Sequence, residues 1–168
     1  MPGLETGKQR GSELLAGYKV EDSGGWGRVK AWVERWIPAV EASGSAQTPL
    51  SLGEFEDLMA YFLRDCGFRL RRIEGTACVL ELPRKMLAGA NVFKGLFGTP
   101  EAEMYRNMKS QYRCALGEDG TLRVTAFEHV AALGREHEAL RAVMAKRLAG
   151  FLREAEELTR RKRERGRF

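Results

Sequence analysis

The first clear hydrophobic periodicity in the chain lies between residues 26 and 40. Apolar side chains recur there every three or four residues, the spacing that places them on one face of a helix. Pro38 is expected to kink or interrupt this helix, because proline lacks an amide hydrogen and collides with the preceding turn. Residues 41–49, which contain Ser, Gly and Pro, are predicted to form a linker.

The next helix has the clearest local signature in the chain. Ser51 and Glu54 stand at the two positions of a capping box, in which the serine hydroxyl accepts from the third helical amide and the glutamate reaches back to the cap. Leu50 and Phe55 are spaced as a hydrophobic staple, and Gly67 is a natural C-terminal stop. We therefore predict a helix between Ser51 and Gly67.

Two β-hairpins are expected after this helix. The first pairs residues 68–73 with 76–82, and the second pairs 112–116 with 122–124. In each hairpin apolar and polar residues alternate, as in strands with one buried face, and a glycine-containing turn separates the two strands.

Helical patterns fill the rest of the chain. Residues 84–97 are apolar on one side but contain glycines, and Thr99 begins a new helix as its N-cap. From Phe127 onward the pattern is helical to the end, with a joint at Gly134. The predicted fold class is α+β: helices packed on two β-hairpins that form a small antiparallel sheet, with a long C-terminal helix.

Length and composition indicate one domain. A chain of 168 residues can bury one substantial core. We expect a flexible N-terminal arm at residues 1–24, a single domain at 25–159 and a basic tail at 160–168. No apolar run is long enough to cross a bilayer, and the N-terminus does not resemble a signal peptide. The chain has three cysteines, an odd number and widely spaced, which fits a reducing cytoplasm better than a disulfide framework.

The net charge of +5 is located in the tail. The rest of the chain carries 22 basic and 22 acidic residues, out of totals of 28 and 23, and is neutral. Clustered arginines neutralise phosphates or acidic protein surfaces. At a helix C-terminus they also complement the dipole, so both interpretations stay open. The tail bases are Arg160, Arg161, Lys162, Arg163, Arg165 and Arg167.

Nothing in the sequence marks an enzyme or a cofactor site. His129 and His137 are the only histidines, and neither has a catalytic or metal-ligating partner nearby in the sequence. Cys78 and Cys114 occupy corresponding places in the two hairpins and could face each other. Without a Cys-x-x-Cys spacing, packing is favoured over zinc binding.

Three tryptophans, Trp26, Trp32 and Trp36, cluster in the first helical segment. Core packing is the default expectation for such large apolar side chains. Any that remain exposed would instead mark a surface for a partner.

Residues 51–126 resemble the 4-vinyl reductase-type domain, whose fold is related to the TRAPP trafficking subunits. Residues 93–98 (FKGLFG) are similar to the glycine-containing helix of that family, and residues 113–124 (RCALGEDGTLRV) to its closing hairpin. The order of helices and hairpins is also similar. The family often has a second cysteine after the hairpin turn, where this chain has Leu122, which argues against a metal role for Cys114.

The resemblance implies a non-catalytic and frequently dimeric module that binds small hydrophobic molecules or acts as an assembly scaffold. It implies a ligand pocket lined by Phe62, Phe93, Leu96 and Phe97. The expected function is accordingly that of a non-enzymatic binding or scaffold protein, sensing a small hydrophobic ligand and self-associating through helical surfaces as a homo-oligomer. The alternative is a protein associated with nucleic acid, or with an acidic protein, through the arginine-rich tail.

Overall fold

The computed structural model describes residues 14–21, 32, 35–36, 39–82, 110–129 and 135–166. In the described residues, a five-stranded antiparallel sheet has the strand order β1-β5-β4-β3-β2. The strands are β1 (Ala39–Ser45), β2 (Arg69–Glu74), β3 (Ala77–Leu82), β4 (Ser110–Leu116) and β5 (Leu122–His129). The predicted α+β class is confirmed, and the two predicted hairpins, β2–β3 and β4–β5, are adjacent in the sheet.

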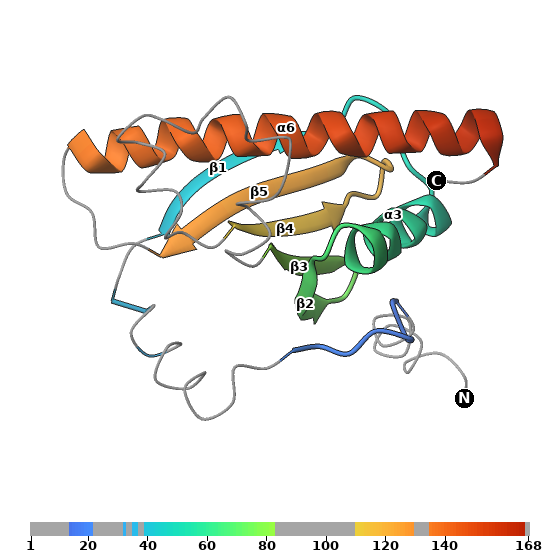
Figure 1. Cartoon of the computed structure of the whole chain (residues 1–168), viewed down its shortest axis with the longest axis horizontal. Helices are drawn as coiled ribbons and strands as arrows, with labels where there is room; N and C mark the ends of the chain where they lie inside the picture. The colour runs from blue at the N-terminus through green and yellow to red at the C-terminus, as the bar shows by residue number, and fades with distance from the viewer. Residues whose placement is uncertain are drawn as a thin grey trace.

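Among the residues that the structure describes, two helices pack on the sheet (Figure 1): α3 (Leu52–Asp65) and α6 (Arg135–Arg165). The capping box predicted for α3 forms, with Ser51 accepting from the Glu54 amide and Glu54 accepting from the Ser51 amide. The staple residues Leu50 and Phe55 are both buried. Helix α6 has 31 residues and lies along the sheet over β1 and β5. The predicted long C-terminal helix is therefore confirmed.

Strand β1 differs from the prediction, which placed Val40 at the end of a helix and residues 41–49 in a linker. Val40, Ala42 and Gly44 point toward α6, whereas the intervening positions are exposed. A Cβ atom on Gly44 would come within 3.1 Å of Leu152 Cδ1, so the glycine lets the helix approach the strand closely. The segment was predicted to be a linker because its residues are small. Its alternation with a period of two is that of a strand.

The end of β5 is a second correction. Residues 127–129, taken as the start of the C-terminal helix, continue β5 and pair with residues 39–41 of β1. The helix begins later, at Arg135. Residues 39–41 were not recognised as a strand, so no pairing partner indicated a longer β5.

Residues 14–21 pack against the folded body, although the sequence predicted a flexible arm over residues 1–24. Leu14 and Leu15 are buried in the core, and the Leu15 amide donates to Glu56 of α3 over 3.2 Å. Further along, the Glu21 amide donates to the Leu70 carbonyl at 2.8 Å. This segment therefore reaches from α3 to the edge strand β2.

The core centres on four aromatic rings from three elements and one connecting loop. Phe151 of α6 stacks on Phe62 of α3 with ring centroids 4.7 Å apart, and on Tyr112 of β4 at 4.5 Å. Phe68, in the loop after α3, meets all three rings edge-on. Stacked and edge-on aromatic pairs add specific geometry to the burial of large apolar surfaces. The cluster joins both helices to the middle of the sheet.

Candidate functional site

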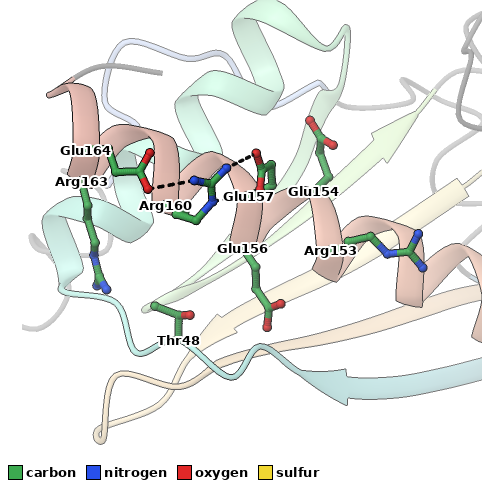
Figure 2. Close-up of a pocket in the computed structure, with 8 residues that line it drawn as sticks. All are labelled: Thr48, Arg153, Glu154, Glu156, Glu157, Arg160, Arg163 and Glu164. Carbon is green, nitrogen blue, oxygen red and sulfur yellow. Dashed lines mark hydrogen bonds and ion pairs between the residues drawn. The ribbon is translucent and has the colours of Figure 1, made fainter.

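The predicted basic tail is the last part of α6 as far as Arg165, and its charges are largely paired within the chain. Arg160 Nη2 lies 2.6 Å from Glu157 Oε1, and its Nη1 lies 2.8 Å from Glu164 Oε1. Figure 2 shows the Arg160 guanidinium reaching between these two carboxylates. Arg161 also contacts Glu157, at 3.1 Å. The hydrogen bond from Arg160 lowers the pKa of Glu157, which favours its charged form.

Two further tail bases reach across to α3. Arg163 Nε donates to Glu54 Oε2 at 2.8 Å, and its Nη2 donates to the Pro49 carbonyl at 2.6 Å. Lys162 forms an ion pair with Asp57. The hydrogen bond from Arg163, followed by that from the Ser51 amide, lowers the Glu54 pKa from 4.5 to about 2. The predicted tail is therefore held against the start of α3 by these contacts, which we call the clamp.

Beside this clamp, α6 and the loop before α3 enclose a groove of about 630 Å³. Its lining is of mixed charge, with three arginines, four glutamates and one threonine. Because the acids outnumber the bases, the groove does not present the positive surface that a phosphate backbone requires. The lining residues, drawn in Figure 2, are Thr48, Arg153, Glu154, Glu156, Glu157, Arg160, Arg163 and Glu164.

Trp32 and Trp36 form an exposed aromatic pair. Their ring centroids lie 6.5 Å apart in an edge-on arrangement. The exposed fraction is 63% for Trp32 and 75% for Trp36, so neither side chain is part of the core. Arg35 beside them is exposed as well. Trp26, the third member of the predicted cluster, lies outside the described residues. Exposure of the pair meets the condition under which the sequence predicted a partner surface.

Cys78 and Cys114 are direct cross-strand partners between β3 and β4, and both are buried. Burial and a hydrogen bond between the two thiols raise the pKa of Cys114 well above its ordinary value. Burial also raises the pKa of the Cys66 thiol, to about 11. Such thiols are held in the unreactive protonated form. The arrangement suits packing, and no group of three metal-binding side chains occurs among the described residues.

The predicted ligand pocket is only partly within the described residues. Phe62 is 2% exposed and stacks in the aromatic cluster, whereas Phe93, Leu96 and Phe97 lie outside the described residues. His129 belongs to β5 and His137 to α6. No described helix has the length and apolar character needed to cross a bilayer.

One charged site was not predicted from the sequence. Glu81 of β3 occupies a polar position of the predicted strand, yet it is 2% exposed and forms an ion pair with Arg71 of β2. Arg71 also donates to the Glu21 carbonyl at 3.1 Å. A buried carboxylate needs such a partner, because burial penalises its charge. The only sequence signal is one acid within an otherwise apolar strand, all six residues of which are buried.

Comparisons with known proteins give no family. No family model matches the chain, and no curated protein or solved structure is significantly similar to it. The resemblance to the 4-vinyl reductase-type domain therefore stays a prediction.

Proposed function

We propose that this chain is a non-enzymatic binding or scaffold protein that docks a partner protein through Trp32, Arg35 and Trp36. The observation that carries the proposal is the exposure of the two tryptophans. Leaving two large apolar rings in water is unfavourable, and burying each in a complementary pocket would stabilise a complex by several kcal/mol, on the order of 2 or more per hot-spot residue.

The composition of this surface favours a protein partner. Tryptophan and arginine are the residue types most enriched among those that dominate protein–protein binding energy. Apart from the tail the chain is electrically neutral, so long-range attraction to a highly charged partner contributes little. The expected partner presents an apolar pocket for the rings, with an acidic rim facing Arg35.

The nucleic-acid alternative is supported less well. Arg160, Arg161, Lys162 and Arg163 already contact carboxylates of the same chain. Binding a phosphate backbone would require these contacts to be exchanged for new ones, which reduces the net gain. The small-ligand version remains a prediction. It is not favoured by Phe62, the one predicted pocket residue within the described part of the chain, because its ring is already packed against other rings.

Photo-crosslinking tests the proposal and supplies the partner. A benzophenone amino acid at position 36 should give one discrete adduct in extract from the source cells, which mass spectrometry identifies. The same amino acid at Leu52, another exposed apolar position, is the matched control. Binding of the purified partner should then weaken roughly 30-fold or more in Trp36→Ala and stay unchanged in Leu52→Ala. Equal affinity of both variants would refute the proposed surface.

A further inference from the structure

The hydrogen-bonding phase of β1 shows which of its backbone groups point outward. The Ala46 amide donates to the Leu122 carbonyl at 2.9 Å, in line with the register that pairs Gly44 with Val124 and Ala42 with Ala126. In an antiparallel pair, residues that exchange hydrogen bonds alternate with residues that do not. The even-numbered residues of β1 therefore bond to β5, and the odd-numbered ones direct their amides and carbonyls away from the sheet.

Within the described residues, this outer edge is open. Glu41, Ser43 and Ser45 are exposed, and no backbone group in the described part of the chain bonds to their outward side. The seven residues of β1 include neither lysine nor proline, which commonly protect edge strands from pairing. An unprotected edge of this length is a ready template for another strand.

Helix α6 presents small side chains on the same side of the molecule. Leu152 packs on Gly44, and Glu156 accepts from the Gln47 amide at 2.7 Å, so these two residues mark the flank of α6 that overlies β1 and the chain just after it. Ala145 and Ala149 precede them by seven residues, or two helical turns, and lie on the same flank. Both alanines are exposed, as is Ala142. The outer edge of β1 and these three alanines together form what we call the β1 edge surface.

We propose that the β1 edge surface binds a second copy of this chain, with β1 pairing antiparallel to its counterpart across a two-fold axis. A second copy fits this surface because β1 is complementary to itself. A two-fold axis at Ala42 pairs all seven residues of β1 and sets Glu41 opposite Ser43 of the second copy, so that no like charges meet in the sheet.

The helices fit the same arrangement. Helix α6 lies between β1 and β5, and strands are about 4.8 Å apart, so the two α6 axes would lie about 10 Å apart. That separation falls at the packing distance of helices, and small side chains permit it. On this flank the short side chains are those of Ala142, Ala145 and Ala149, all of them exposed.

Charge complementarity supports this register. Ala42 precedes Gly44 by about 7 Å along the strand, or four to five helical residues, which places Ala145 near the axis. Because α6 and its counterpart would run antiparallel, Glu138, seven residues before Ala145, would face Arg153 of the second copy. Both side chains are exposed. The surface thus carries opposite charges at matching distances from its centre.

Sedimentation equilibrium of the full chain tests the proposal, with twice the 18.9 kDa of one chain as the expected mass. Ser43→Pro removes an outward amide, a substitution that edge strands tolerate, and should raise the dissociation constant at least tenfold. Ser43→Ala is the matched control, since it loses the hydroxyl contact with Thr125 but keeps the amide, and should still dimerise.

A second variant, outside β1, keeps the proposal testable if Ser43→Pro disturbs the folding of the strand. Ala145→Glu brings like charges together at the axis and should also give monomers, whereas Leu52→Glu on α3 should not. Circular dichroism must show that each variant is folded. A wild-type chain that stays monomeric up to millimolar concentration, or a dimer that survives both Ser43→Pro and Ala145→Glu, would overturn the proposal. Trp36→Ala should leave the dimer intact, which separates this test from that of the partner surface.

Discussion

Replacing Phe151 with alanine should strongly destabilise the fold, because its ring joins both helices to the sheet. The ring is 7% exposed and stacks on Phe62 and Tyr112, while Phe68 meets it edge-on. Truncating a buried phenylalanine to alanine costs about 3–5 kcal/mol in lost burial and cavity formation. The three partner rings belong to α3, the loop after it and β4, and they cannot all move in to fill the space of a missing side chain, so we expect a cost in the upper half of that range.

Urea unfolding followed by far-UV circular dichroism measures this cost at one fixed protein concentration. In a chain of this size the melting temperature should fall by about 8–20 °C. Phe151→Leu keeps most of the volume and should cost less than about 2 kcal/mol. Leu52→Ala, at an exposed position, should stay within about 0.5 kcal/mol of the wild type.

The result also bears on ligand binding. A cost below about 1 kcal/mol for Phe151→Ala would mean that the rings around Phe62 are loosely packed, and would refute the tight cluster described here. Such looseness would favour the ligand pocket that the sequence predicted beside Phe62. A large cost, by contrast, would show that these rings pack tightly against one another.

Three other predictions follow from the clamp and the thiols. Because the Glu54 pKa is about 2 when folded against an ordinary 4.5, the stability it contributes is complete above pH 4.5 and declines as pH falls toward 2. Arg163→Ala should flatten that acid limb in urea midpoints measured against pH, and an unchanged slope would argue against the contact. Deleting residues 160–168 should lower the melting temperature, because it removes the two ion pairs between the tail and α3. An unchanged melting temperature would indicate a tail that projects from the body. Iodoacetamide should label the half-buried Cys66 slowly and the buried Cys114 only on unfolding, and mass spectrometry showing early labelling of Cys114 would contradict its burial.

Local signals account for the elements that were predicted from sequence. The capping box at Ser51 and the alternating hairpins depend on residues close together in the chain, and they form as expected. Strand β1 was missed because its pairing partner, β5, lies more than 75 residues away, and its small side chains carry a weak apolar signal. Tertiary pairing, which no local pattern shows, decided its structure.

The candidate sites show the same division. The sequence located the basic tail and the tryptophans, but the partners of a charged side chain depend on the fold. Arg163 meets Glu54 across 109 residues of sequence, so its neutralisation could not be read from the tail alone. For the tryptophans, only the fold distinguishes core packing from an exposed surface.

Fluorescence quenching by acrylamide tests the exposure of Trp32 and Trp36 most directly. In a Trp26→Phe variant these two are the only tryptophans, and the chain on its own should show a red-shifted emission quenched nearly as strongly as free tryptophan. The purified partner should shift that emission to the blue and protect it. A blue, poorly quenched emission from the chain alone would place both rings in the core and contradict the proposed partner surface.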